Sequence, residues 1–285
     1  MAFRIRSFGC HALRFFQGHP AAGGQHFLAL RGQPGDQAAK SILRITSILR
    51  ERVWQLCGRQ YARIRVNIDT TVKTNGVDFS VFWDNRDFSA NPSKGFGFRG
   101  KVSRDFGWFN SSNSWTNVEG ELDIYFPFKV GDWLRQGVVA LNHWTSYSPT
   151  WEVESDETIS NRPPAYTGST LGGLWRMRGF PTQRFNDRAA AYYAAELRLI
   201  PEWNPFDNWP RVQKYVGIKW LQFVPFGEIG RVAPDWSFSR LHSDMKWDVG
   251  LGVRAWAQGI VIRIDSAYSE EGVGVQMMIA QPFQF

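Results

Sequence analysis

The sequence predicts an all-β protein, a transmembrane antiparallel β-barrel, and three observations lead to that fold class. From Tyr61 onward apolar and polar residues alternate with a period of two, the pattern of β-strands with two unlike faces. The polar faces carry charges of both signs, which a small dry core would not hold. The alternation continues to the last residue, Phe285, and outer-membrane barrels commonly close on such a strand.

Ten strands account for the alternation. We expect them at 61–72, 77–88, 95–108, 116–128, 136–150, 190–200, 216–231, 244–257, 259–269 and 272–284. The stretch 116–128 is representative, because Leu122 and Ile124 face one way while Glu121 and Asp123 face the other. Charged inner faces and apolar outer faces are expected where the interior is wet and the surroundings are lipid. Strands of about 9 to 14 residues also match a tilted crossing of the bilayer.

The final strand carries a signal of its own. Val273, Val275 and Met277 share one face, and the same alternation places Phe283 and Phe285 there. We expect these two aromatic residues to mark the closing strand and to lie in the aromatic girdle at the membrane surface.

Composition excludes some classes of function and leaves others open. No run approaches about 20 apolar residues, so no transmembrane helix is expected. Fourteen Trp and 22 Phe suit interfacial girdles, although an aromatic-rich soluble sandwich or a soluble ligand-binding barrel stays open on composition alone. The net charge of +7 would suit nucleic acid or anionic lipid. Because no nucleic-acid motif accompanies the charge, we expect no nucleic-acid partner.

The residues that usually carry chemistry form no recognisable site. Cys10 and Cys57 are the only cysteines, and their spacing fits no zinc or redox motif. His143 and His242 are isolated polar positions. The chain contains no Gly-x-Ser-x-Gly element, so it should not hydrolyse lipid. We therefore expect no enzymatic activity, no metal and no cofactor.

The N-terminal part differs from the rest. It is rich in Arg but lacks the apolar core of a secretory signal, and its segment 38–56 has the pattern of a basic amphipathic helix. That segment is either a membrane-surface helix or an extension without a native fold. We predict a basic, poorly ordered extension at 1–59 and the β-barrel domain at 60–285.

Two connections, 151–189 and 201–215, are long and rich in Pro, Asn, Gly and Trp, whereas Gln258-Gly259 is a tight join. The first of them is too long for an idle connection in a compact domain. We expect it to be functional or to fold inward.

The long connection contains the segment LGGLWRMRGFPTQRFNDR at 171–188, with Arg178, Gly179, Phe180 and Asp187. It resembles the conserved loop of the BamA/TamA superfamily of outer-membrane assembly and secretion barrels, whose single-domain form is called bacterial surface antigen. The segment FGEIGRV at 226–232 is similar to a family strand and has Glu228 where the family has Asp. The resemblance implies that the loop folds back into the lumen and that Arg178 meets Glu228 there.

Two further segments agree with the family. Asp84, Arg86 and Asp87, followed by NPSKG ending at Gly95, look like the family's hairpin motif. The aromatic-ended last strand is the fourth matching segment. Together the four segments cover residues 77–285 in the family's order.

The resemblance implies a function and a place in the cell. Family barrels have sixteen strands preceded by periplasmic POTRA modules, so a chain with ten strands is expected to be an N-terminally truncated member. It would lie in the outer membrane of a Gram-negative-type cell, although an export signal is missing from the chain. Its expected partners are outer-membrane lipid, unfolded outer-membrane or secreted polypeptides, and periplasmic modules or lipoprotein subunits that the chain does not encode. The implied function is insertion of outer-membrane proteins or translocation of polypeptides, and the alternative is a passive pore or transporter barrel.

Overall fold

The computed structural model describes residues 8–18, 73–109, 111–129, 131–153, 159–279 and 283, and for 8–18 it describes the backbone alone. The chain divides into two compact units, of which one comprises Met1–Gly18 and Lys73–Phe285 and the other His19–Val72. The second unit lies outside the described residues, so the fold described below is that of the first.

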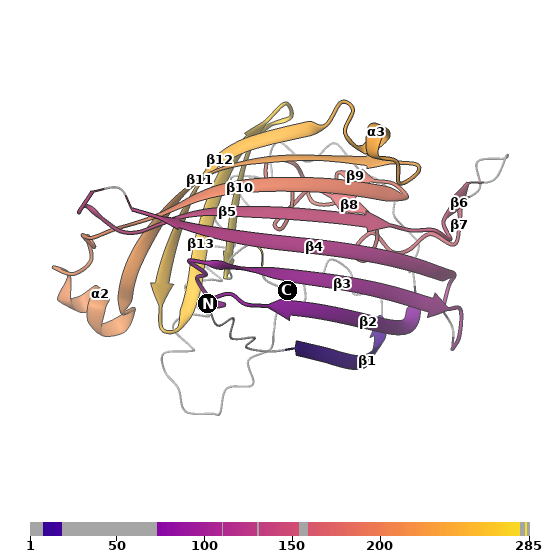
Figure 1. Cartoon of the computed structure of the whole chain (residues 1–285), viewed down its shortest axis with the longest axis horizontal. Coiled ribbons are helices and arrows are strands. Elements are labelled where there is room, and N and C mark those ends of the chain that lie inside the picture. Colours follow the sequence, from indigo (N-terminus) through magenta and orange to yellow (C-terminus); the bar gives the residue numbers. More distant parts are fainter. Residues whose placement is uncertain are drawn as a thin grey trace, which may run out of the picture. The chain divides into compact units, whose positions relative to one another are not determined.

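One ten-stranded sheet dominates this unit (Figure 1). Its order in space is its order along the chain, and every neighbouring pair is antiparallel. The strands are β1 (Phe8–Gly18), β2 (Thr74–Asp84), β3 (Gly95–Phe106), β4 (Ser114–Phe128), β5 (Leu134–Tyr147), β10 (Ala189–Pro201), β11 (Ile218–Ala233), β12 (Lys246–Ala257), β13 (Ile260–Ser269) and β14 (Gly272–Ile279).

The connection between β5 and β10 holds two small hairpins of its own. They pair β6 (Glu152–Val153) with β7 (Ile159–Ser160), and β8 (Thr170–Leu171) with β9 (Phe185–Asn186). Two short helices, α2 (Pro210–Tyr215) and α3 (Phe238–Leu241), lie in the connections on either side of β11. Across the described part of the chain no helix has the length and apolar character needed to span a membrane.

The all-β antiparallel fold is confirmed, and nine of the ten predicted strands have a counterpart in the sheet. The predicted strand 61–72 lies outside the described residues. The neighbour of β2 is instead β1, which pairs Phe8 with Trp83 and which the alternation did not predict. Within the described residues β1 and β14 are the two edges of the sheet and no ladder joins them. Closure into a barrel, its strand number and the domain boundary near residue 59 therefore stay predictions.

The two faces of the sheet have the predicted composition. On β12, Trp247, Val249 and Leu251 are about half exposed, whereas Asp248 and Arg254 on the other face are fully buried. We call these the outer and the inner face. The expectation of a wide, wet lumen is wrong at this level of the sheet, because the inner-face charges are covered by the rest of the protein rather than by solvent.

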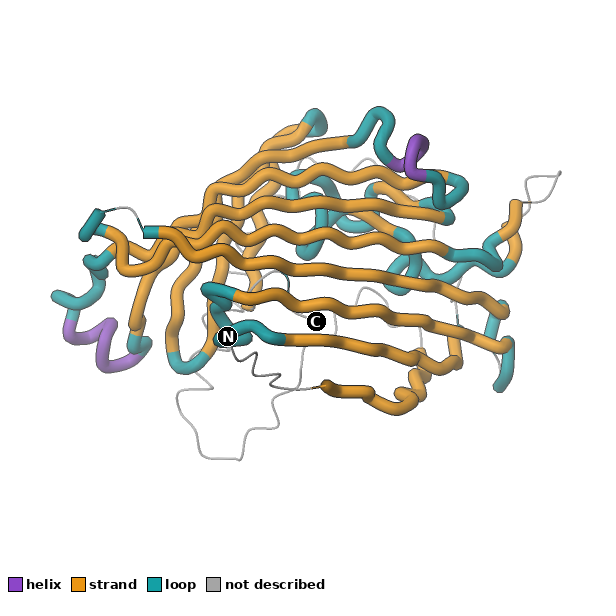
Figure 2. Tube along the Cα trace, viewed as in Figure 1, coloured by secondary structure: helices purple, strands orange, loops and turns teal. Residues whose placement is uncertain are grey.

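The connections gather at the two ends of the strands (Figure 2). Because the strands are antiparallel, the connection with α2 (202–217) lies at the same end as 258–259, and we call it the α2 end. The connection with α3 (234–245) lies at the opposite end with 148–188 and 270–271, and we call it the α3 end. The two long connections thus belong to opposite ends of the sheet.

Candidate functional site

The segment between β8 and β9 doubles back on itself and lies against the inner face. Gly172 and Gly173 have φ angles of +108° and +109°, a region in which residues with a side chain are strained. A Cβ at Gly172 would lie 2.3 Å from the carbonyl oxygen of Pro181. Leu171 and Met177 are completely buried by this turn. The glycine pair thus lets the loop fold tightly enough to bring its tip into the interior.

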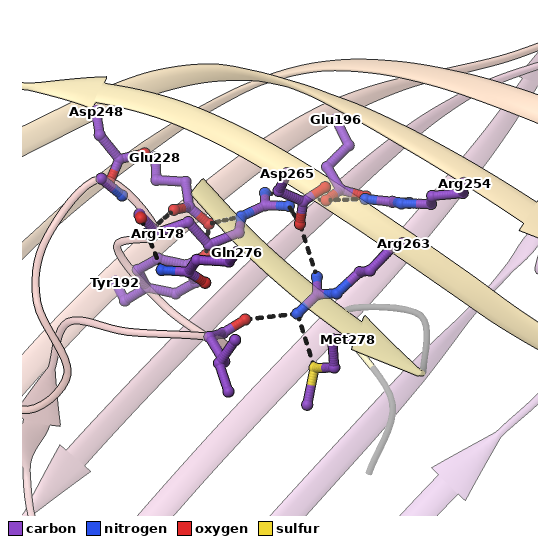
Figure 3. Close-up of polar contacts among 12 residues, drawn as sticks. Arg178, Tyr192, Glu196, Glu228, Asp248, Arg254, Arg263, Asp265, Gln276 and Met278 are labelled. Carbon is purple, nitrogen blue, oxygen red and sulfur yellow. Dashed lines mark hydrogen bonds and ion pairs between the residues drawn. The ribbon is translucent and has the colours of Figure 1, made fainter. Parts of the chain in front are cut away.

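At the tip of the loop, the Arg178 guanidinium meets three carboxylates from three strands (Figure 3). Nε lies 3.0 Å from Glu228 Oε1 on β11, Nη1 3.0 Å from Asp265 Oδ2 on β13, and Nη2 3.0 Å from Glu196 Oε1 on β10. The backbone N–H of Arg178 also donates to Glu228 Oε2, at 2.5 Å. The Phe226 ring centroid lies 3.5 Å from Cζ. The guanidinium is thus enclosed by opposite charge and by an aromatic face.

The backbone of the tip extends the contact to the last strands. Gly179 N–H donates to Asp248 Oδ2 on β12 at 3.1 Å, and the Gly179 carbonyl accepts from Ser269 Oγ at 2.8 Å. The Arg178 carbonyl accepts from Gln276 Nε2 on β14 at 2.8 Å. Two loop residues therefore bond to every strand from β10 to β14.

The carboxylates around Arg178 have further cationic partners. Glu196 accepts from Arg254 at 2.7 Å and from Arg198 at 2.9 Å. Asp265 lies 3.2 Å from Arg263. Around Arg178 lie four buried arginines and four buried acidic residues: Arg178, Arg198, Arg254 and Arg263, and Glu196, Glu228, Asp248 and Asp265. We call these eight residues the Arg178 network. Such burial is tolerated only when each charge is paired, so losing one member leaves others uncompensated.

Arg178 keeps its charge in this setting. Complete burial by itself lowers the pKa of the guanidinium, but the nearby charges of Glu228, Glu196 and Asp265 outweigh it and raise the pKa well above its ordinary value. The loop tip therefore remains a cation in this setting.

Gly179 fits because it has no side chain. A Cβ there would lie 2.6 Å from the Cβ of Asp248 and 3.1 Å from the Cβ of Ser269. The first distance is too short for two carbon atoms and the second is tight, and both neighbours belong to strands of the sheet. The glycine of the Arg-Gly-Phe triplet is thus required by the close approach of the loop to β12 and β13.

The other side of the loop contacts strands from the N-terminal half of the sheet. The Arg176 guanidinium stacks 4.1 Å from the Trp144 ring centroid on β5 and lies 3.4 Å from Glu121 on β4. Glu121 also pairs with Arg99 on β3 at 2.8 Å. The loop therefore joins both halves of the sheet.

A second segment, the β2–β3 connection at 85–94, also reaches the inner face. Asn91 donates to Gln136 Oε1 on β5 at 3.0 Å and accepts from Gln222 Nε2 on β11 at 3.1 Å. The ring of Phe88 lies 5.7 Å from that of Trp256 on β12. This connection therefore reaches the inner face near the α2 end, where Gln222 is the cross-strand neighbour of Arg254 in the Arg178 network.

The predicted hairpin residues shape that connection. Asp84 and Arg86 form a two-point ion pair with distances of 2.7 and 2.8 Å. Asp87 accepts from the backbone N–H groups of Ser93 at 2.8 Å and Lys94 at 3.3 Å. Gly95 has a φ of +103°, and a Cβ there would lie 2.7 Å from a backbone oxygen. These residues fold the connection.

Phe283 does not lie in the outward row in which we expected it. β14 ends at Ile279, and Phe283 is buried in the core beneath the loop. Its carbonyl accepts from Arg86 Nη1 at 3.2 Å and from Tyr125 OH at 3.3 Å, and its ring lies 5.5 Å from Arg198 Cζ. The period of two ends with the strand, so it does not place a residue four positions further on. Phe285 lies outside the described residues.

Several other candidates lie away from the network. Asp187 accepts from the N–H of the next residue, and Phe180 is buried with its ring edge-on to Phe185. His143 and His242 both contact Tyr193 on the outer face. Among the residues that the structure describes, no group of three or more His, Cys, Asp or Glu could hold a metal ion.

Most residues of the Arg178 network could not be assigned to the site from the sequence. Asp248, Arg254, Arg263 and Asp265 were visible as polar residues alternating with apolar ones. Their meeting at one point depends on strand register, since Asp265 pairs with Gly252 on one side and Gln276 on the other. The alternation shows which face each residue occupies but not how far along the sheet it lies.

These features define a class of protein: an antiparallel sheet with an apolar outer face, whose polar inner face holds an inserted arginine loop. A comparison with family models matches residues 40–285 to the Omp85 superfamily domain. Because the match covers more than half of the chain, this protein belongs to the Omp85 superfamily, which confirms the resemblance found in its motifs. A comparison with curated proteins gave no match.

Proposed function

We propose that this protein is an outer-membrane β-barrel protein that assists the insertion of outer-membrane proteins or the translocation of polypeptides. Membership of the Omp85 superfamily and the exposed apolar outer face support this role. The apolar face would lie in the lipid of the outer membrane of a Gram-negative-type cell. The partners would be unfolded outer-membrane or secreted polypeptides, with periplasmic modules or lipoprotein subunits supplied by other chains or segments.

The observation that carries the proposal is the attachment of one loop tip to every strand from β10 to β14. A sheet that must act on other polypeptides needs one region that keeps its shape while another opens. The Arg178 network would keep the strands from β10 to β14 in fixed curvature, and the opening would lie beyond them, at the outer edge of β14 between the last strand and the first. No covalent chemistry is needed for this role, so the proposal is non-enzymatic and uses no cofactor.

The burial of the inner-face charges counts against the passive-pore alternative. A selective pore needs charged groups in contact with water along its path. Arg178, Arg254 and Glu196 are instead fully buried against the loop. These three side chains would stabilise the packing of the loop against the sheet, and they would contribute little to the selectivity of a pore.

Assisted folding of a client tests the proposal directly. The full chain would be reconstituted in phospholipid vesicles, and a urea-denatured eight-stranded outer-membrane barrel would be added by dilution. We expect the client to acquire heat-resistant compactness several times faster than in empty vesicles. Vesicles carrying an equal amount of the Arg178→Ala variant serve as the matched control and should accelerate less. Equal client folding in all three preparations would contradict the proposal, and a large steady ionic current would favour the pore.

A further inference from the structure

The connection between β10 and β11 carries several exposed aromatic side chains. Trp203, Trp209 and Tyr215 are each more than half exposed within thirteen residues of chain. None of the residues of α2 is buried. Aromatic side chains with a polar edge are favoured where apolar and wet regions meet.

The surface is ordered. Asn204 and Gln213 both donate to the carbonyl of Ile218 at 3.0 Å, which fixes the two arms of the connection to the start of β11. The Phe206 ring is edge-on to that of Trp209 with centroids 5.5 Å apart. The aromatic groups are therefore presented on a folded platform.

This platform continues into the apolar outer face. Glu202 N–H donates to the carbonyl of Trp133 at 2.9 Å, which joins the connection to the neighbouring one between β4 and β5. Trp133 itself is more than half exposed, and so is Phe126 on the outer face of β4. The exposed aromatic groups thus lie at the margin of the face that the proposed function places in lipid.

The basic residues of the platform have no acidic partners, unlike those at the opposite end. Arg211, Lys214 and Lys219 are exposed, and among the described residues no carboxylate lies within ion-pair distance of them. At the α3 end Arg240 pairs with Asp235 at 2.7 Å. Two more pairs there join Arg231 to Asp244 and Lys246 to Glu270. The α2 connection also carries Glu202 and Asp207, so the two ends differ in ion pairing: the basic residues at the α2 end are left without an ion pair among the described residues.

We propose that the α2 surface, formed by Trp203, Trp209, Tyr215, Arg211 and Lys214, binds the head groups of anionic phospholipids. The aromatic rings would lie at the level of the head groups, and the two cations would contact lipid phosphates. This inference rests on the proposed membrane location of the sheet. It adds that the two ends meet different lipid surfaces, with the α2 end in the leaflet that contains anionic phospholipid.

Lipid binding to the full chain tests the inference. The chain would be refolded in uncharged micelles and titrated with phosphatidylglycerol or phosphatidylcholine of the same acyl chains, with binding followed by native mass spectrometry. We expect tighter binding of phosphatidylglycerol. Each basic residue near an anionic surface contributes about a fivefold change in affinity, so Arg211→Gln with Lys214→Gln should lower the affinity for phosphatidylglycerol more than tenfold. The affinity for phosphatidylcholine should not change.

The α3 end supplies the matched control. Arg240→Gln with Lys246→Gln removes the same charge from residues that are already paired, and we expect less than a twofold change. Trp203→Ala with Trp209→Ala should weaken both lipids alike.

Equal affinity for the two lipids, or an equal loss in the two charge variants, would overturn the inference. The inference would also be overturned if Arg211→Gln with Lys214→Gln bound lipid as the wild type does but no longer co-purified with an acidic protein that the wild type retains. A chain that forms no heat-resistant compact species in any micelle would contradict the proposed membrane barrel itself, and the lipid inference with it.

Discussion

Arg178 illustrates why an arginine is needed at the loop tip. Its three guanidinium nitrogens lie 3.0 Å from carboxylates on three different strands, which a single ammonium group could not contact with the same planar geometry. Removing one partner from a buried set of charges typically costs about 3 to 5 kcal/mol. We therefore expect Arg178→Ala to lower the free energy of unfolding by an amount of this order. Urea unfolding in micelles, followed by loss of heat-resistant mobility on gels, measures it.

Arg240 provides the comparison for that prediction. Its ion pair with Asp235 is exposed, and exposed pairs contribute at most about 1 kcal/mol. An Arg178→Ala variant no less stable than Arg240→Ala would show that the network does not hold the loop.

Substitution of Gly179 should also destabilise the protein, although less than substitution of Arg178. In Gly179→Ala the new methyl carbon would lie 2.6 Å from the Cβ of Asp248, so the tip must withdraw from β12. We expect a loss of about 1 to 3 kcal/mol, as for other overpacked cores. Gly120→Ala is the control, because its Cβ would lie 3.8 Å from the nearest atom. If both variants unfold at the same urea concentration, the close approach of the loop is not required.

Single residues of the site could be predicted only in part. The motif resemblance led to Arg178 and Glu228, and the structure places the two side chains together. Glu196 and Asp265 required knowledge of which positions of β10 and β13 lie level with the loop tip. That depends on sheet curvature and on the depth to which the loop enters, neither of which the alternation of residue types contains.

The β2–β3 connection gives a prediction at the scale of an element. Burial alone would raise the pKa of Asp87, but hydrogen bonds from Ser93 and Lys94 outweigh it and lower the pKa. A carboxylate with a depressed pKa stabilises the fold at pH values above its unfolded-state pKa, and that stabilisation disappears as the pH falls through the folded-state value. We expect protection of the Ser93 and Lys94 amides from hydrogen exchange to be constant at neutral pH and to fall below about pH 3.8, the ordinary Asp value.

Substitution at neutral pH separates this effect from general acid denaturation. Asp87→Ala should raise exchange in 85–94 on the order of two- to fivefold, since the group is largely exposed. Exchange in β12 should not change. Unchanged exchange in 85–94 would mean that Asp87 does not hold the connection.

Phe283, which follows β14 in the sequence, offers a second test. Phe283 is buried against Tyr125, and large-to-small changes in a core cost about 3 to 5 kcal/mol for Phe. Phe283→Ala should therefore destabilise the protein by an amount near the lower end of that range. Phe109→Ala, at a residue that is 82% exposed, serves as control. If Phe283→Ala and Phe109→Ala unfolded at the same urea concentration, Phe283 would be exposed, as the alternation in the sequence indicated, and not part of the core.

The elements themselves were more predictable than their ends. Strands such as β4 and β12 have eight or more alternating residues, and this pattern determines both their type and their faces. β1 was not predicted, because Phe8–Gly18 mixes aromatic and basic residues without alternation. The position of Phe283 was also missed, because its carbonyl contacts Arg86 and Tyr125, which both lie far away in sequence.

At the scale of the whole molecule, two segments cross the inner face in series. The loop tip at Arg178 lies against β10 to β14, and the connection at Asn91 lies nearer the α2 end. Ions that pass along the interior would meet both, and the narrower of two obstructions in series sets the current. We expect very small currents from the wild type in planar lipid bilayers. Arg178→Ala and Asn91→Ala should each change the current little, because each leaves the other segment in place.

The double variant is the decisive case. With both segments released, the current should exceed the sum of the two single-variant currents, a non-additivity expected when two sites act on one path. The Arg240→Ala variant, altered outside the interior, should behave as the wild type does. A large, steady wild-type current that rises in proportion to salt concentration would mean that water already fills the interior, and the buried Arg178 network could not then be the state of the protein in a bilayer. If the current of the double variant equalled the sum of the two single-variant currents, the two segments would obstruct separate paths.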